Sequence, residues 1–388
     1  MLRIYNSLSR TIEKVTFSNN TCTIYVCGIT PYDTTHLGHA FTYVTFDTFI
    51  RFLRWKKISV RYTQNVTDID DPLFERARKV GTDWKTLGNT WTARYLSDMA
   101  FLHVAQPNHF VKVTQEIDQI ITIIKVIIAK DLAYAREGYV YFDVVKDKEY
   151  GKLSRLTPSE MTIISRERGN DPRDPRKKNP LDFILWQPSK EDEPSWPGPF
   201  GDGRPGWHIE CSAMSMKYLG KQIDIHGGGR DLIFPHHESE IAQSESYTDI
   251  KPFVRYWMHT AMVQHEGKKM SKSLGNLVLV DKLRHKHSAG AIRWYLLNHH
   301  YRKEWNFDEK ELTRAEEEVK QIRTLTADNA NNDRKGDMST MDAFVAALDN
   351  DFDTPTAQQI IIDTAKQSVG EKNNPLLARM MHILGIPV

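Results

Sequence analysis

The first 66 residues combine two short apolar segments with a longer segment between them, and this order restricts the fold more than any other feature. Thr23–Val26 is expected to form a short buried strand. The segment from His39 to Leu53 has apolar residues at helical spacing, and Ile58–Val66 alternates like a second strand. A strand, a helix and a strand in this order predict a βαβ unit of an α/β fold, with parallel strands and a ligand site at their carboxyl ends.

The composition is that of an ordinary globular protein. Of the 388 residues 40% are hydrophobic and 26% charged, and the formal net charge is only +2, so the charge total neither favours nor excludes nucleic acid binding. Three cysteines fit a reducing compartment such as the cytoplasm better than a disulfide framework. The longest apolar runs, such as residues 120–129, are too short to span a bilayer, so no membrane role is expected.

Further patterns predict an α/β core, an insertion and a helical end. After about residue 115, a helical stretch, a strand at 139–142 and a long Pro-rich run indicate an inserted connective subdomain. Strands are then expected at Ile223–Ile225 and at His259–Val263, each followed by a functional loop, and the chain beyond residue 285 is expected to be helical. The predicted division is a parallel-sheet core at 1–115 and 201–285, a subdomain at 116–200 and a helical bundle at 286–388.

Two short motifs contain the side chains expected to bind phosphate. In the HLGH sequence, His36 and His39 lie between the first strand and its helix, where free backbone N–H groups and the helix dipole favour an anion. Lys269 and Lys272 of the KMSKS sequence are suited to hold a leaving pyrophosphate. Alone, these motifs are an ordinary pair of surface histidines and an ordinary solvated loop. Together, in this order and each after an expected strand, they predict a catalytic ATP site.

Four further residues form a set suited to a metal ion. Cys27, Cys211, His236 and Glu240 offer two thiolates, an imidazole and a carboxylate, which is a ligand set suited to tetrahedral Zn²⁺. His236 and Glu240 are four residues apart, so one helix can direct both to one ion. The alternative is a pair of buried core cysteines and a helix-surface His/Glu pair. A zinc ion at this place would select a substrate thiolate over the hydroxyl of serine.

HLGH and KMSKS together resemble the nucleotide signatures of class I aminoacyl-tRNA synthetases, and with the metal ligands nearly the whole chain resembles the cysteinyl-tRNA synthetase family. The resemblance implies a Rossmann-like class I synthetase core that activates L-cysteine with ATP, Zn²⁺ and Mg²⁺. The residues implied to surround the cysteine part of the adenylate are Cys27, Gly28, Ile29, Thr30, Asn65, Val66, Thr67 and Trp207. Those implied to approach the nucleotide are Thr42, Gly229, Asp231, Val263, Lys269 and Lys272. Without the resemblance, Thr67 is a strand-end hydroxyl and Trp207 a core aromatic.

Several segments resemble a relative of the tRNA-charging enzymes, the mycothiol-pathway ligase that joins cysteine to the amine of glucosaminyl-inositol. They include CGITPYDTTHLGHA, QNVTDIDDPLFERA, ERGNDP and NHHYRKEW. The segment after Ser273 has room for a helical bundle but little for a further anticodon-reading domain, which also favours the ligase. Glu240 points the other way, because this carboxylate is typical of the tRNA-charging enzymes, and it implies four protein ligands before cysteine binds.

The expected acceptor is therefore glucosaminyl-inositol, with tRNA as the alternative partner. A basic run between Arg166 and Lys178 is compatible with nucleic acid binding, but a solvated flexible loop explains it equally well. A third hypothesis is an inactive paralogue that acts as a binding module, although such a protein should have lost one of the signatures. The sequence thus predicts an ATP-dependent, adenylate-forming cysteine ligase.

Overall fold

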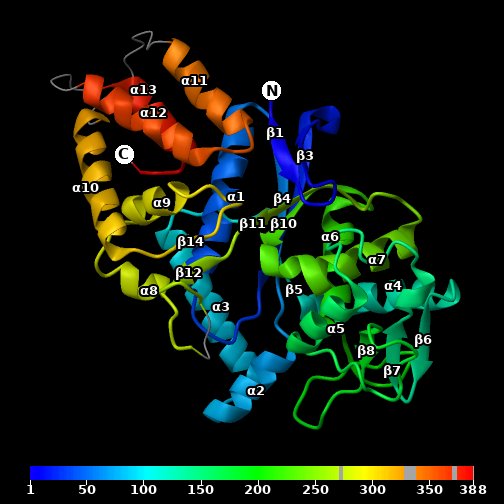
Figure 1. Ribbon diagram of the computed structural model, residues 1–388. Coiled ribbons are helices and arrows are strands. Elements are labelled where there is room, and N and C mark those ends of the chain that lie inside the picture. Colours follow the sequence, from blue (N-terminus) through cyan, green and yellow to red (C-terminus); the bar gives the residue numbers. More distant parts are fainter. Residues whose placement is uncertain (271–273, 327–337, 369–373, 388) are drawn as a thin grey trace.

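The computed structural model describes residues 1–270, 274–326, 338–368 and 374–387. Its centre is a sheet of parallel strands (Figure 1). In spatial order these strands are β11 (Val254–Thr260), β10 (Ile223–Gly229), β3 (Thr21–Ile29), β4 (Ser59–Val66) and β5 (His109–Lys112). Helix α1 (Leu37–Trp55) connects β3 to β4, which pair in parallel, so the predicted βαβ unit is confirmed.

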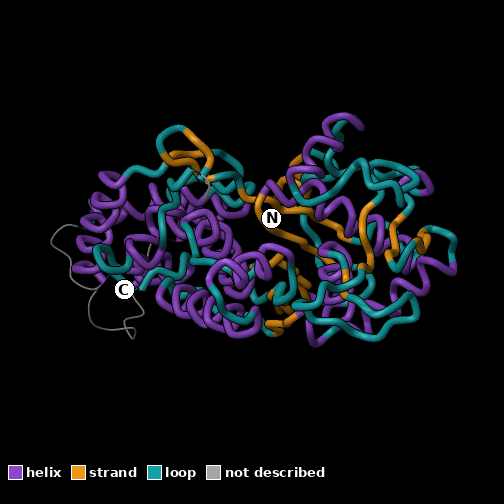
Figure 2. Tube along the Cα trace, turned by 90° about the horizontal axis from the view of Figure 1, so that it is seen from below, coloured by secondary structure: helices purple, strands orange, loops and turns teal. Residues whose placement is uncertain are grey.

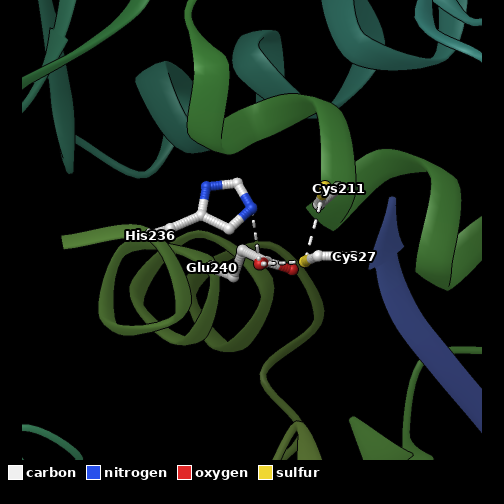
Figure 3. Close-up of side chains that lie close together, drawn as sticks. All are labelled: Cys27, Cys211, His236 and Glu240. Carbon is white, nitrogen blue, oxygen red and sulfur yellow. Dashed lines mark hydrogen bonds and ion pairs between the residues drawn. The ribbon is translucent and has the colours of Figure 1, made fainter. Parts of the chain in front are cut away.

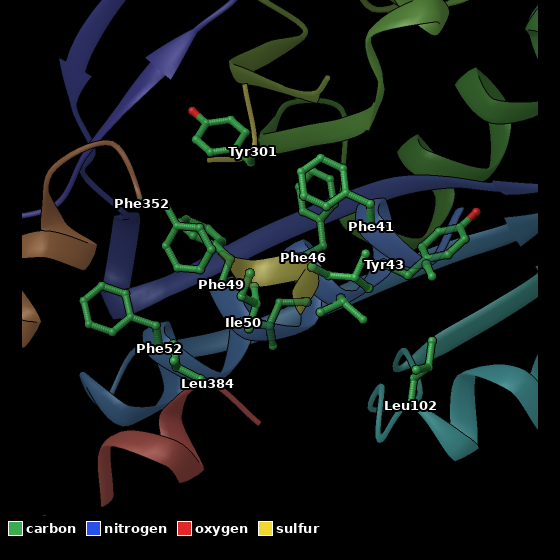
Figure 4. Close-up of a cluster of buried hydrophobic side chains, with 14 of the residues drawn as sticks. Phe41, Tyr43, Phe46, Phe49, Ile50, Phe52, Leu102, Tyr301, Phe352 and Leu384 are labelled. Carbon is green, nitrogen blue, oxygen red and sulfur yellow. The ribbon is translucent and has the colours of Figure 1, made fainter. Parts of the chain in front are cut away.

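Helix α1 is buried on most of its surface, because its aromatic residues face both the sheet and the C-terminal part of the chain. Phe49 and Phe52 are fully buried, and Phe49 makes an edge-to-face contact with Phe352, with ring centroids 5.2 Å apart. Figure 4 shows these rings together with Leu384 near the C-terminus. Burying one phenylalanine side chain contributes roughly 1.5–3 kcal/mol. This core therefore fixes the position of α1 and of the HLGH sequence at its start.

The C-terminal part of the described chain is helical, as predicted. Its helices are α8 (Val280–Leu283), α9 (Ala289–Leu297), α10 (Glu309–Thr326), α11 (Met338–Asp349), α12 (Thr354–Gln367) and α13 (Pro375–Ile383). Figure 1 shows α10 to α13 on one side of the central sheet, and Figure 2 shows strands between helix-rich regions on both sides. α1 and α9 pack together, so the helical part continues the core of the sheet.

The inserted segment forms a second, antiparallel sheet on the other side of the molecule (Figure 1). Its elements are α4 (Ile117–Ala129), β6 (Ala133–Arg136), β7 (Tyr139–Phe142), α5 (Pro158–Glu167), β8 (Phe183–Gln187) and β9 (Arg204–Pro205). β7 is the strand predicted at 139–142, and it pairs with β6 and β8. Helix α6 (Trp207–Leu219) then leads back to β10 of the central sheet.

The prediction of a single strand at His259–Val263 was wrong. β11 ends at Thr260, and a separate strand, β12 (Val263–His265), begins after two residues. The break occurs because Ala261 donates its backbone N–H to the Tyr301 carbonyl, at 2.7 Å, and the chain leaves the parallel sheet. β12 instead pairs with β13 (Lys268–Lys269) and with β14 (Trp305–Asn306). Lys269 therefore lies on a small hairpin beyond the end of β11.

The remaining elements surround the sheet. They are β1 (Arg3–Asn6), β2 (Thr11–Lys14), α2 (Asp71–Val80), α3 (Trp84–Phe101) and α7 (Glu238–Thr248). In the part of the chain that the structure describes, no helix combines the length and the apolar character needed to cross a membrane. The division of the chain at residues 115, 200 and 285 stays a prediction.

Candidate active site

A cavity of about 870 Å³ lies at the carboxyl ends of the parallel strands, where the βαβ pattern predicts a ligand. Its lining includes most of the predicted site residues: Cys27, Gly28, Ile29, Thr30, His36, His39, Thr42, Asn65, Thr67, Trp207, Cys211, Gly229, Asp231, His236, Val263 and Lys269. Two predicted residues do not line it, because Val66 is fully buried in β4 and Glu240 lies behind the cavity wall in α7. Lys272 lies outside the described residues. The HLGH histidines, Lys269 and three of the four predicted metal ligands thus meet at one cavity.

The four predicted metal ligands come together from separate elements (Figure 3). Cys27 lies near the end of β3, Cys211 in α6 and Glu240 in α7, and His236 lies in the π-helical turn Ile233–His237 that precedes α7. The two sulfur atoms are 4.0 Å apart, and Cys27 Sγ is 3.8 Å from Glu240 Oε1. His236 Nε2 is 3.1 Å from the same oxygen. All four side chains are buried.

These distances fit the edges of a tetrahedron around one ion. With zinc–sulfur bonds of about 2.3 Å, two thiolate ligands are about 3.8 Å apart, and nitrogen and oxygen ligands at about 2.1 Å are about 3.4 Å apart. The sulfur pair at 4.0 Å and the nitrogen–oxygen pair at 3.1 Å are close to these values. The four donor atoms therefore form a possible metal-binding cluster that needs little rearrangement.

Burial sets the protonation of the cluster. Burial lowers the pKa of His236 well below its ordinary value, and the His208 and His226 rings lower it further, so this imidazole is neutral at pH 7 and has a free lone pair. Burial raises the pKa of Cys27, and contacts with Cys211 and Glu240 add to the shift. A bound cation would reverse that shift, because it stabilises the thiolate.

Histidines that the sequence analysis did not single out surround the cluster. His226 Nε2 lies 3.0 Å from Glu240 Oε2, and His208 Nδ1 lies 3.0 Å from His236 Nδ1. Each of these rings therefore orients one predicted ligand, as second-layer groups do at metal sites. The available signals were His226 directly after a predicted strand and His208 within GWHIEC, but neither spacing showed which ligand the ring would meet.

A second set of possible ligands overlaps the first. His237 Nε2 lies 3.3 Å from Cys27 Sγ and 3.9 Å from Glu240 Oε1, and with His226 these groups form another buried cluster of four donors. His259 orients the His237 ring, because His237 Nδ1 lies 2.8 Å from His259 Nε2. This set has one thiolate where the predicted set has two, so the predicted set is the better match to Zn²⁺.

The cavity wall beside the cluster is shaped by Gly28, Asn65, Thr67 and Trp207. Gly28 donates its N–H to Asn65 Oδ1 at 2.8 Å, and a Cβ atom at position 28 would lie 1.6 Å from the Asn65 carbonyl oxygen, so only glycine fits. Asn65 Nδ2 donates to Thr67 Oγ1 at 3.1 Å. The Trp207 indole stacks on His236, with ring centroids 4.4 Å apart. A small ligand at the cluster would therefore meet an aromatic face and a fixed polar edge.

The HLGH sequence forms the start of α1. His36 is the N-cap, its Nδ1 accepts the Gly38 N–H at 3.1 Å, and its ring stacks on His39 at 3.8 Å. Gly38 permits this arrangement, since a Cβ atom there would lie 3.0 Å from the His36 ring. The Leu37 N–H donates to the Val278 carbonyl at 2.8 Å, which ties the helix start to the segment after KMSKS. Two imidazoles and a helix N-terminus thus lie together at the cavity.

The remaining predicted nucleotide residues lie around the same opening. Thr42 Oγ1 is 2.7 Å from Thr260 Oγ1, which joins α1 to the end of β11. Asp231 accepts a hydrogen bond from Arg168 Nη2 at 3.0 Å, so the inserted segment reaches the end of β10. Lys269 is exposed in the β12–β13 hairpin.

Two cations of the basic run in the inserted segment make contacts within the chain. Arg176 forms an ion pair with Asp174 at 2.7 Å and lies 3.8 Å above the Tyr139 ring. Lys178 lies 4.2 Å from the centre of the Tyr134 ring. Arg176 and Lys178 are therefore engaged within the chain, and the choice between the two interpretations of the whole run stays a prediction.

Comparison with solved structures identifies the class of the fold. The structure of methionyl-tRNA synthetase from Mycobacterium tuberculosis in complex with methionyl-adenylate superposes with a TM-score of 0.66 over 94% of this chain and 90% of that one, at 15% sequence identity. At that identity the likeness concerns the fold, which is the class I synthetase fold.

The family follows from sequence comparison. Residues 13–317 match the family of tRNA synthetases class I (C) catalytic domain, and the chain belongs to this family. A cysteine--tRNA ligase of Dehalococcoides mccartyi is 43% identical over 94% of this chain and 80% of the relative. An L-cysteine:1D-myo-inositol 2-amino-2-deoxy-alpha-D-glucopyranoside ligase of Acidothermus cellulolyticus is 41% identical over 97% of this chain and 93% of the relative. Relatives of both kinds are thus similar to the chain to the same degree.

Proposed function

We propose that the protein is an ATP-dependent ligase that activates L-cysteine as cysteinyl-adenylate and transfers it to the amine of glucosaminyl-inositol, releasing AMP and pyrophosphate. One observation carries the proposal: a buried cluster of two cysteines, a histidine and a glutamate lies at the same cavity as the HLGH helix start and Lys269. Family membership and the names of both kinds of relatives support an enzyme that acts on cysteine.

Cys27, Cys211, His236 and Glu240 would hold Zn²⁺, and their donor types and spacing fit this ion. When bound, the ion supplies a Lewis acid that prefers a thiolate to the hydroxyl of serine. Trp207 covers His236 and keeps water from this end of the cavity, and Gly28, Asn65 and Thr67 orient the amino acid. Ile29 and Thr30 complete the wall.

The nucleotide residues would position ATP so that the cysteine carboxylate is in line with the α-phosphorus. His36 and His39, beside the N-terminus of α1, donate to phosphate oxygens. Thr42, Gly229, Asp231 and Val263 would surround the nucleoside. Mg²⁺ would accompany the pyrophosphate and offset its charge. Lys269 contacts the departing pyrophosphate and stabilises its growing charge. We assign the same role to Lys272, which lies outside the described residues.

The choice of an amine acceptor rests on two supports. Arg176 pairs with Asp174 and lies over Tyr139, and Lys178 lies over Tyr134, which leaves fewer cations for an RNA backbone. The amino-sugar ligase of Acidothermus cellulolyticus matches over nearly the whole of both chains. Charging of tRNA is the second candidate, because the cysteine--tRNA ligase of Dehalococcoides mccartyi is equally similar.

The test supplies purified protein, ATP and cysteine with either glucosaminyl-inositol or tRNA. We expect cysteine-dependent ATP–pyrophosphate exchange, and a stoichiometric amide with AMP from the amino-sugar. Cysteinylated tRNA without amide would replace the acceptor but keep the activation step. No exchange with zinc-loaded protein would contradict the enzyme itself and favour an inactive paralogue.

A further inference from the structure

One side of the cavity has an excess of carboxylates that the activation of cysteine does not use. We call it the acidic wall: Asp70, Asp71, Glu75 and Glu210. Asp70 and Asp71 lie at the start of α2, and Glu210 lies in the first turn of α6, directly before Cys211. The acidic wall is therefore attached to the elements that hold the proposed cysteine site.

Arg204, a cation on this side of the cavity, already binds two acidic side chains. Arg204 Nη2 donates to Asp71 Oδ1 at 2.6 Å, and its Nε donates to Glu193 Oε2 at 3.0 Å. Glu193 also accepts from Arg78 at 2.9 Å, so the arginines and acids form a network that fastens α2 to the loop before β9. Arg204 thus balances Asp71 and leaves Asp70 and Glu210 without a hydrogen-bonded cation among these contacts.

Glu210 is the group that points to a ligand. Its side chain lines the cavity but is only 1% exposed, and among the described residues its Oε2 has no hydrogen-bond partner. Leaving a buried polar atom unsatisfied costs roughly 1–3 kcal/mol, and more when it is charged. A hydrogen-bond donor that enters the cavity would remove this cost.

Asp70 lines the same cavity as Glu210, and the two side chains interact electrostatically. Its Oδ1 accepts the Asp71 N–H at 2.9 Å and so caps α2, while its Oδ2 accepts only a long hydrogen bond of 3.3 Å from Thr30 Oγ1. A carboxylate oxygen accepts two hydrogen bonds, so Oδ2 retains capacity for a ligand. Burial raises the pKa of Asp70 to about 6, and the neighbouring Asp71 adds to the shift, which makes Asp70 a stronger base than an ordinary aspartate.

We propose that Glu210 and Asp70 form the acceptor subsite, which binds the amine and a neighbouring hydroxyl of the amino-sugar. This inference rests on the proposed function. The unpartnered Glu210 oxygen and Asp70 Oδ2 can accept hydrogen bonds from an amine and from sugar hydroxyls, which donate them. The acidic wall thereby names the chemical class of the acceptor: a small polyol with an amino group.

The transfer step balances without another reactant. The neutral amine nitrogen forms a bond to the carbonyl carbon of the adenylate, and the bond from that carbon to the phosphate oxygen breaks. AMP leaves with the electron pair. The proton that the nitrogen loses passes to the Asp70 carboxylate and then to water.

The experiment compares Glu210→Gln and Asp70→Asn with the parent protein, after zinc analysis has shown equal metal content. Glutamine keeps the size of Glu210, and asparagine still caps α2. Glu75→Gln removes an exposed carboxylate of the same wall and serves as the matched control. Each protein is assayed for ATP–pyrophosphate exchange with cysteine and for amide formation with glucosaminyl-inositol.

We expect normal exchange in all three variants. Glu210→Gln should raise the KM for the amino-sugar about tenfold or more, and Asp70→Asn should lower the rate of amide formation by a similar factor. A parent protein that forms no amide would contradict the proposed function itself. A parent that forms amide while both variants match it would overturn only the acceptor subsite. A rise in the KM for cysteine in the exchange assay would also overturn it, because Glu210 would then bind the amino acid.

Discussion

The two ends of the cavity are built in different ways. At the metal end, Cys27, Cys211, His236 and Glu240 are buried, and neighbouring histidines hold two of them in place. At the nucleotide end, the equivalent groups are a helix start with two histidines and a lysine on an exposed hairpin. The side chains of the metal end are buried in the core. Those of the nucleotide end lie nearer the surface, on elements that pack against the core.

This difference teaches what each end can contribute. Buried ligands with fixed neighbours can recognise one side chain precisely, since geometry and donor type decide the binding energy. Exposed cations at a loop contribute mainly when charge develops on a phosphate. We therefore expect changes at the metal end to affect which amino acid binds, and changes at the nucleotide end to affect how fast it reacts.

The largest effect is expected for Cys211→Ala. The variant lacks one of the two thiolates of the cluster, so it should lose bound zinc and nearly all cysteine activation while it still binds ATP. Metal analysis, exchange kinetics and equilibrium ATP binding test this. The matched control is Cys22→Ala, a buried cysteine outside the cluster, which should keep its zinc. Full zinc occupancy in Cys211→Ala would show that the cluster is not the metal site.

The next effect is expected for Lys269→Ala. If Lys269 stabilises the leaving pyrophosphate as proposed, loss of its charge should lower the rate of activation by about 10²-fold, with unchanged zinc content and cysteine affinity. Single-turnover adenylate formation measures it. Lys268→Ala changes the neighbouring residue of the same hairpin and should be near normal. Weaker cysteine binding at an unchanged rate would move Lys269 from the nucleotide end to the amino-acid end.

A smaller effect is expected for Glu240→Gln. Glutamine keeps the shape but removes the charge, so zinc affinity should fall about tenfold and discrimination against serine should weaken. Competition with a chelator gives the zinc affinity. The control is Glu238→Gln in the same helix, whose carboxylate accepts the backbone N–H groups of Leu153 and Ser154 instead. Equal zinc affinity in parent and Glu240→Gln would leave Glu240 as a packing residue.

The smallest effect concerns how the stability of the fold changes at acid pH. It depends on His299, which lies near the nucleotide end. His299 stacks on Trp305 of β14, which pairs with β12 of the hairpin sheet. Burial lowers the pKa of His299 to about 4, so the unfolded chain, with an ordinary histidine pKa near 6.5, binds more protons than the folded chain between these values. This contribution to stability is therefore complete above about pH 6.5 and is lost as the pH falls towards 4.

Urea unfolding at pH 7 and pH 5 tests this prediction. His299→Gln should lose about 1 kcal/mol less stability than the parent between these two values, because the partial exposure of His299 reduces the full linkage effect. His285→Gln, which changes an exposed histidine, should behave like the parent. Equal losses in parent and His299→Gln would show that His299 is not held neutral.

The sequence predicted those parts of the molecule that depend on local patterns. The βαβ unit and the strand at 139–142 follow from side-chain periodicity, and both are confirmed. The strand at His259–Val263 was wrong, because the break after Thr260 depends on a hydrogen bond to Tyr301, which is distant in sequence. The same limit applies to the partner of His226 and to Glu210 Oε2, which has no partner among the described residues, because both arise only when separate elements meet.

The most direct test of the account is equilibrium binding of cysteine and serine to zinc-loaded and zinc-depleted protein, measured by titration calorimetry. If the buried cluster selects the substrate through its metal, zinc-loaded protein should bind cysteine more tightly than serine by a factor on the order of 10³ or more. Removal of zinc should abolish most of that difference. An unchanged preference for cysteine in zinc-depleted protein would contradict the account, because the selectivity would then lie elsewhere in the cavity.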